Sequence, residues 1–186
     1  MAKLQFSVTA LVIKRTNVGE LDRVVTLISQ EKGKFAVIAK GARSLLSSRL
    51  SLLEPGMLIT AYCVPTQSLP ILTQAKTATT LPRDFNNLAQ LKVLTQFLEF
   101  IDALFVEEEI ESDLFAQILT LHKLAMVSPG SRDKIYQGMK DILFKLGYLD
   151  PNQPSDKTIT EQVAEITQKK MVSFSYLTVH DSKGVK

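Results

Sequence analysis

The hydrophobic positions of this chain change their spacing near residue 80. Before that point apolar residues recur at every second position, as Phe6, Val8 and Ala10 do, and polar residues stand between them. Period two is the spacing of a β-strand with one buried face. Further apolar, β-branched runs follow. Together the runs predict five strands, at residues 6–12, 24–28, 35–39, 57–64 and 71–76.

The breaks between these runs indicate how the strands connect. Residues 30–34 are polar and contain a glycine, which is typical of a hairpin. Residues 41–56 form a longer and more basic connection after the third strand. Five short strands with this spacing fit a small closed barrel. The OB-fold is the commonest barrel of this kind that binds oligonucleotides, but strand count alone does not separate it from an SH3-like barrel.

Beyond residue 80 the apolar spacing becomes helical. Residues 88–105, 112–127 and 131–146 place leucine, isoleucine and phenylalanine three and four positions apart, which predicts a helix in each segment. A fourth helix is expected after residue 158. Residues 172–176 alternate again, so they are compatible with a final short strand.

Two of these helices carry recognisable start signals. Asn86 or Asn87 is placed to cap the first helix, because an asparagine side chain accepts hydrogen bonds from unpaired backbone N–H groups. Thr158 with Glu161 has the spacing of a capping box, which opens the fourth helix.

The change of pattern coincides with a change of charge. Residues 1–80 hold ten Lys or Arg and four acids, a net +6, whereas residues 81–186 hold twelve and fifteen, a net −3. Pro82 interrupts the pattern, so we expect an α+β protein of two domains, 1–80 and 81–186. A basic half joined to an acidic half is an indication of polyanion binding, although small domains also differ by a few charges through chance.

Catalytic motifs are absent from the sequence. It contains no GxxxxGK[ST] loop, no GxGxxG fingerprint and no GxSxG elbow. Cys63 stands in a predicted strand and is expected to be a small buried hydrophobe. His122 has no second histidine or acid one helical turn away and is expected to be structural, and the acids of residues 107–111 are expected to be solvated. An enzyme is therefore disfavoured, and we expect no metal or other cofactor.

The basic residues of the first half stand mostly at strand ends and in connections. There a lysine or arginine can meet a phosphate without being buried. Each one alone is more often a solvated surface charge. The predicted DNA contacts are Lys14, Arg15, Arg23, Lys32, Lys34, Lys40, Arg43 and Arg49.

Aromatic residues are scarce in the same half. Phe6, Phe35 and Tyr62 all fall on predicted strands, at positions compatible with the core. Proteins that grip single strands by their bases use exposed aromatic platforms. This half is therefore expected to bind through the nucleic-acid backbone, with strong salt dependence and little sequence preference. Bases left free in this way could still pair with another strand.

A series of short motifs resembles the N-terminal domain of the DNA repair protein RecO family. Their order and spacing agree over about 50 residues, and residues 144–148 (FKLGY) extend a looser similarity into the second half. The motifs are residues 10–15 (ALVIKR), 19–23 (GELDR), 25–27 (VTL), 32–34 (KGK), 39–43 (AKGAR), 48–49 (SR) and 53–55 (LEP).

The resemblance implies a five-stranded OB-fold β-barrel followed by an all-α helical domain. It implies a non-enzymatic recombination mediator that binds single- and double-stranded DNA and anneals complementary strands. The implied partners are RecR, with which family members assist RecA loading, single-strand binding protein and RecA. The apolar runs are too short to span a bilayer and the N-terminus lacks a signal-peptide pattern, so a cytoplasmic, nucleoid-associated protein is expected.

The sequence also departs from the family. Many members carry a four-cysteine zinc site after the segment that matches residues 144–148, whereas no cysteine follows Cys63 here. The region after Tyr148 is also shorter than is usual in the family. An interaction scaffold, whose helical half holds RecR or single-strand binding protein in an apolar groove, is therefore the main alternative, and a nuclease is a weaker one.

Overall fold

Ten elements make up the part of the chain that the computed structural model describes, residues 5–44, 51–79, 87–128, 130–150 and 157–176. The strands are β1 (Phe6–Val18), β2 (Asp22–Ser29), β3 (Gly33–Ala39), β4 (Leu58–Val64) and β5 (Ile71–Thr77). The helices are α1 (Leu88–Leu104), α2 (Ser112–Val127), α3 (Arg132–Lys145), α4 (Ile159–Thr167) and α5 (Val172–Tyr176).

The five strands close into a barrel in the order β1-β2-β3-β5-β4. Neighbouring strands pair antiparallel, except that β3 meets β5 in parallel through the pair Ile38 and Ile71. This barrel and the helices that follow it confirm the predicted fold, an OB-fold and a helical part. The boundary at residue 80 stays a prediction, because residues 80–86 lie outside those described.

Alternating side chains fill the barrel, as period two requires. Strands β1 to β4 turn every second residue inward, β5 contributes Leu72 and Ala75 on either side of a register shift, and these residues form one apolar cluster. Phe35 is buried in it, and Phe6 packs against it from the edge. The cluster comprises Val8, Ala10, Val12, Val25, Leu27, Phe35, Val37, Ala39, Ala42, Leu53, Met57, Ile59, Ala61, Cys63, Leu72 and Ala75.

Strand β1 is longer than its hydrophobic pattern predicted. It continues to Val18, with a register shift between Val12 and Lys14, and its second half pairs only with β2. Residues 14–18 are exposed, so they carry no buried alternation by which the sequence could have marked them as strand. The extension makes a long β1–β2 hairpin that projects the basic residues of β1 beyond the barrel core.

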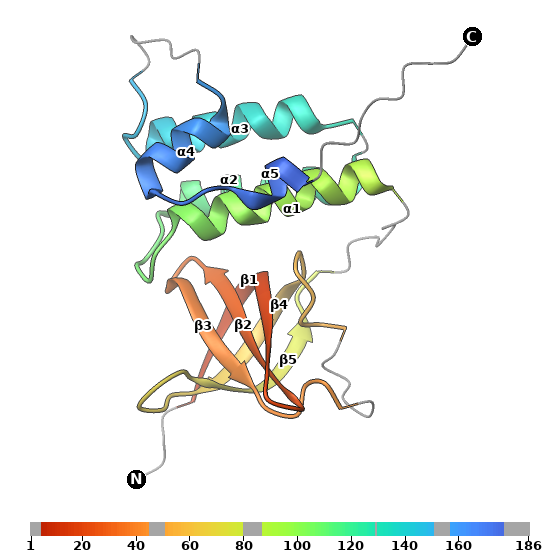
Figure 1. Ribbon diagram of the computed structural model, residues 1–186. Coiled ribbons are helices and arrows are strands. Elements are labelled where there is room, and N and C mark those ends of the chain that lie inside the picture. Colours follow the sequence, from red (N-terminus) through yellow and green to blue (C-terminus); the bar gives the residue numbers. More distant parts are fainter. Residues whose placement is uncertain (1–4, 45–50, 80–86, 129, 151–156, 177–186) are drawn as a thin grey trace, which may run out of the picture.

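The helices lie as a layer against the barrel (Figure 1). The outward-facing residues Leu11, Ile13 and Ile28 of β1 and β2 are buried in the same apolar cluster as the helix cores. Helix α1 supplies Phe97, Phe100 and other fully buried residues to that cluster and packs against β1. The barrel and the helices therefore share a hydrophobic core of their own, distinct from the barrel interior.

Two backbone hydrogen bonds fasten the β2–β3 hairpin to the segment between α1 and α2. Lys34 N–H donates to the Val106 carbonyl over 2.8 Å, and Ile110 N–H donates to the Gln30 carbonyl over 2.8 Å. Gly33 stands between them with a φ of +58°. The close approach of the two backbones leaves no room there for a Cβ atom.

The helix starts follow the predicted signals. The Asn87 side chain accepts hydrogen bonds from two backbone N–H groups of α1, and Thr158 with Glu161 forms the capping box of α4. The pKa of the Glu161 carboxyl group is lowered, because its charged form accepts hydrogen bonds from the Thr158 backbone N–H and from the Thr158 hydroxyl.

The expected final strand is wrong, because Val172–Tyr176 is the short helix α5. The carboxylate of Glu99 in α1 accepts the Val172 and Ser173 backbone N–H groups at 2.7 Å and 2.9 Å, and it also accepts the Ser173 hydroxyl. These bonds satisfy the first turn of a helix from a distant part of the chain. No helix within the described ranges is long and apolar enough to cross a membrane.

Candidate nucleic-acid interface

Lys14 and Lys34, which we call the lysine pair, meet at one carboxylate. Their Nζ atoms lie 3.6 Å and 3.4 Å from the carboxylate oxygens of Asp102, near the end of α1. Lys34 also donates to the Asp102 backbone carbonyl. The Lys14 side chain is 58% exposed and the Lys34 side chain 19%. Lys14 can therefore reach a ligand in solvent, whereas Lys34 mainly ties the barrel to α1.

Arg15, Arg23 and Arg43, which we call the arginine cluster, gather at the β1–β2 hairpin. Arg15 and Arg23 share the carboxylate of Glu54, at 2.9 Å and 3.4 Å. Arg23 also donates through Nε to the Asn17 side chain. Its side chain is 8% exposed, so Arg23 acts mainly as an internal support for the hairpin.

Arg43 reaches the same hairpin from the connection after β3. Its guanidinium donates to the Gly19 carbonyl over 3.1 Å, and its backbone N–H donates to the Leu21 carbonyl over 2.9 Å. Asp22 accepts the Gly41 backbone N–H at 2.8 Å, which fixes the start of that connection against the hairpin. The local fold thus brings cations of two separate segments to one edge of the barrel.

The remaining predicted contacts are dispersed. Lys32 lies with its Nζ 4.5 Å from the Phe6 ring centroid, at the hairpin between β2 and β3. Lys40 is exposed directly after β3 and has a further interaction within the protein. Arg49 lies outside the described residues.

The outer face of β2 and β3 connects these groups. Its residues Val24, Thr26, Ala36 and Ile38 alternate with the buried core positions and are half-buried. Thr26 pairs with Lys14 across β1–β2, and Lys40 follows the end of β3. An uncharged strip therefore runs between cations at its two ends. Such a strip can hold sugars and base edges while lysines meet phosphates.

Carboxylates moderate the positive charge of this region. Glu20 is exposed at the hairpin tip, while Asp22 and Glu54 are engaged as backbone cap and ion-pair partner. The sequence showed the cations but not their partners, because Asp102 and Glu54 lie far along the chain from the lysines and arginines they contact. Pairing with an acid reduces but does not abolish the attraction of a cation for phosphate.

Cys63 and His122 are buried, as expected. Burial raises the pKa of the Cys63 thiol to about 11, which keeps it in its unreactive protonated form. Burial lowers the pKa of His122, whose Nε2–H donates to the Gly56 carbonyl over 2.7 Å. His122 thus joins α2 to the barrel. Among the described residues no group of three His, Cys, Asp or Glu is placed to hold a metal ion.

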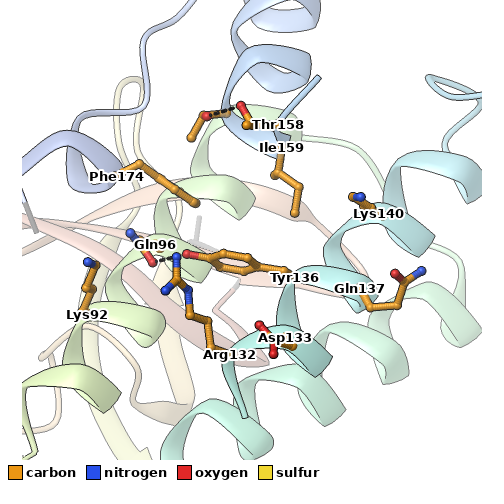
Figure 2. A pocket seen from close by; sticks show the side chains of 11 residues that line it. Lys92, Gln96, Arg132, Asp133, Tyr136, Gln137, Lys140, Thr158, Ile159 and Phe174 are labelled. Atoms are coloured by element: carbon orange, nitrogen blue, oxygen red, sulfur yellow. Dashed lines mark hydrogen bonds between the residues drawn. The ribbon is translucent and has the colours of Figure 1, made fainter. Parts of the chain in front are cut away.

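A second candidate site is a groove on the helical layer, between α1, α3, α4 and α5 (Figure 2). Its volume is about 460 Å³. Tyr136 forms the centre: its hydroxyl donates to Gln96 Oε1 over 2.7 Å, and its ring centroid lies 6.0 Å from that of Phe174. Arg132 lies over the same ring at 5.2 Å. Lys92 and Lys140 line the groove as well, so an apolar floor carries a largely basic rim.

Comparison with known proteins finds one family at the N-terminal part of the chain. Residues 1–81 match the model described as recombination protein O N terminal. Among relatives called DNA repair protein RecO, that of Salinibacter ruber is 34% identical over 118 residues, which cover 62% of this chain and 45% of the relative. That of Synechococcus elongatus is 35% identical over 114 residues, 60% of this chain and 42% of the relative. That of Heliobacterium modesticaldum is 28% identical over 141 residues, 76% and 49% respectively. The match spans less than half the length of each relative.

Proposed function

The chain belongs to the RecO family, whose N-terminal model its residues 1–81 match, and from this premise we propose that it is a DNA-binding mediator of recombinational repair. It binds single- and double-stranded DNA through phosphate contacts of the barrel and anneals complementary strands. Its partners are RecR, single-strand binding protein and RecA, whose loading it assists. It works in the cytoplasm, at the nucleoid.

The observation that carries this proposal is the convergence of cations on the β1–β2 hairpin and the β2–β3 face. Arg15 and Arg43 come from β1 and from the connection after β3, and both reach the same hairpin. Lys14 and Lys40 stand exposed at the two ends of the uncharged strip. We assign phosphate contacts to Lys14, Arg15, Lys32, Lys40, Arg43 and Arg49, and supporting positions to Arg23 and Lys34.

Binding rather than catalysis is the proposed activity. The thiol of Cys63 and the imidazole of His122 are the nucleophilic groups that the sequence singled out, and both are buried. Phosphate contacts leave the bases free to pair with a second strand. A protein that gathers strands through their backbones lowers the repulsion between them and raises their local concentration, which accelerates annealing.

Charge reversal at the proposed contacts tests this function. Lys40→Glu with Arg43→Glu should lower the affinity for single-stranded DNA at least about tenfold and slow annealing, because each lost phosphate contact removes released counterions. The matched control is Lys123→Glu with Lys134→Glu, two exposed lysines on the helices, which changes the net charge equally. An equal loss of DNA affinity in both variants would show a general effect of net charge and would contradict the assigned site.

The groove on the helical layer favours a second candidate function, a scaffold that holds a protein partner. Its aromatic floor suits apolar side chains, and Arg132, Lys140 and Lys92 suit carboxylates at the rim. For this scaffold function, the proposed partners are RecR and the tail of single-strand binding protein. DNA contact would then be incidental.

Two charge-reversal variants distinguish the two proposed functions. Arg132→Glu with Lys140→Glu should abolish binding of the tail peptide of single-strand binding protein, measured by calorimetry, and leave binding of naked DNA unchanged. The variant Lys40→Glu with Arg43→Glu should do the reverse. If annealing survives reversal of the barrel charges but fails when the groove is altered, the scaffold is the primary function.

A further inference from the structure

The outer face of β1, β4 and β5 differs from the rest of the barrel surface. The first half of β1 turns Val8 and Ala10 inward, and β4 turns Ile59, Ala61 and Cys63 inward. The residues between them face outward and stay exposed or half-buried. These outward residues are Ser7 and Thr9 on β1, Thr60 and Tyr62 on β4, and Gln74 and Lys76 on β5.

The register arranges these side chains in two rows across the three strands. Tyr62 stands between Ser7 on β1 and Gln74 on β5, and in the next row Thr60 stands between Thr9 and Lys76. Tyr62 is thus an aromatic ring among short or polar neighbours on the outer face of the barrel. The sequence suggested a core position for it, because the alternation of β4 alone does not say which face is inside.

Lys76 adds a positive charge beside the ring. Its Nζ lies 5.6 Å from the Tyr62 ring centroid, and its side chain is exposed. Residues 5–13 and 55–79 contain no Asp or Glu, so the chain segments that build this face carry no carboxylate. An acid-free face with an aromatic ring and a lysine favours a polyanion with exposed π-faces.

We propose that this face is a second site for single-stranded nucleic acid, in which a base stacks on Tyr62 and Lys76 binds an adjacent phosphate. Hydroxyl groups of Thr9 and Thr60 are placed to donate to the same strand. Stacking on an aromatic side chain needs an unpaired base, which selects a single strand over a duplex. The inference rests on the proposed function and deepens it, because it names a second strand-binding surface.

This surface is separate from the cationic edge described above. The lysine pair and the arginine cluster belong to the second half of β1 and to the β2–β3 side, whereas Tyr62 and Lys76 lie on β4 and β5, on the other side of β1 in the barrel order. Figure 1 shows β2 and β3 toward one side of the barrel and β5 toward the other. One chain can therefore hold two strands at once, which is what joining complementary strands requires.

Strand stoichiometry tests the inference. Native mass spectrometry with short oligodeoxythymidine, too short to reach both faces, should show two strands per wild-type chain. Tyr62→Thr removes the ring but keeps a good β-former and should bind one strand, whereas Tyr62→Phe should still bind two. Only one abasic strand of the same length should bind to each wild-type chain.

The annealing rate of Tyr62→Thr should fall at least about fivefold, which is the effect of losing one stacked base. Tyr148→Thr, an exposed tyrosine on the helical part, is the matched control.

The outcomes separate the two proposals. One strand on the wild type, or two on Tyr62→Thr, would overturn the second site. If the wild type binds one strand and the variant Lys40→Glu with Arg43→Glu binds none, the proposed function stands without the second site. Absence of any bound strand at low salt would contradict the proposed function itself. Lys76→Gln, with Lys123→Gln as its control, should weaken the second strand and leave the first unchanged.

Discussion

At the residue scale, His122 places a titratable ring in the contact between the helices and the barrel. Its Nε2–H donates to the Gly56 carbonyl, and only 1% of the residue is exposed. Burial disfavours the protonated form, so the folded protein holds the pKa below the ordinary value of 6.5. In the unfolded chain the ring is free to take up a proton near that ordinary value.

This difference predicts an acid-sensitive stability. As pH falls through about 6.5 the unfolded state binds a proton that the folded state does not, so the free energy of unfolding decreases. Between about pH 7.5 and 5.5 the loss for one proton is at most about 1.4 kcal/mol. His122→Gln keeps an N–H donor but does not titrate, so urea unfolding should show a smaller loss in this variant. An identical pH dependence in both proteins would contradict the assignment.

Glu54 is a second residue that matters for stability, because it pairs with two arginines of the β1–β2 hairpin. It pairs with Arg15 at the surface and with Arg23, whose side chain is 8% exposed. Glu54→Gln leaves Arg23 with a weaker partner, and we expect the free energy of unfolding to fall by about 1–3 kcal/mol. Chemical denaturation measures this loss. Glu20→Gln, an exposed acid of the same hairpin, should change stability by less than about 0.5 kcal/mol.

At the element scale, the β2–β3 hairpin depends on a glycine at the contact with the helices. A Cβ atom on Gly33 would lie 2.1 Å from the Glu108 carbonyl oxygen and 2.4 Å from that of Val106. Both are backbone atoms, and the hairpin is hydrogen-bonded to the same segment. The turn therefore needs glycine for its positive φ and for the space between two backbones.

Gly33→Ala should consequently destabilise the protein more than an ordinary turn substitution. Gly19→Ala is the matched control, since Gly19 has nearly the same φ, +57°, and nothing within 4 Å of its Cβ position. We expect about 1 kcal/mol for the control from backbone strain and at least about 2 kcal/mol more for Gly33→Ala from the clash. Equal losses in urea unfolding would show that the hairpin does not dock as described.

At the element scale, the sequence predicts most of the strands and helices but not all of them. The five strands, the first helices and both caps follow from local periodicity and from side chains within one turn. The second half of β1 and helix α5 do not, because each is stabilised from elsewhere: pairing with β2 for residues 14–18, and the Glu99 carboxylate for Val172 and Ser173. The cations of the site were visible in the sequence. The acids that hold them and the outward position of Tyr62 depend on the register and packing of distant segments.

At the scale of the whole molecule, the barrel and the helices share an apolar core. Leu11, Ile13 and Ile28 face away from the barrel interior and belong to the same apolar cluster as the helix cores. The barrel therefore presents different surfaces on different sides: one covered by helices, one cationic along β1–β2 and β3, and one acid-free across β4 and β5. Of the proposed phosphate contacts that the structure describes, Lys14 and Lys40 are exposed, and Lys14 lies beside α1 through its ion pair with Asp102.

The salt dependence of single-strand binding tests the central claim most directly. A fluorescent oligodeoxythymidine is titrated with the protein at several salt concentrations, and the logarithm of the affinity is plotted against the logarithm of the salt concentration. The six assigned phosphate contacts predict a straight line with a slope of about −4, and reversal of Lys40 and Arg43 should make the slope shallower by about 0.7 for each lost contact. Absence of binding at low salt, or an affinity that does not change with salt, would contradict the account.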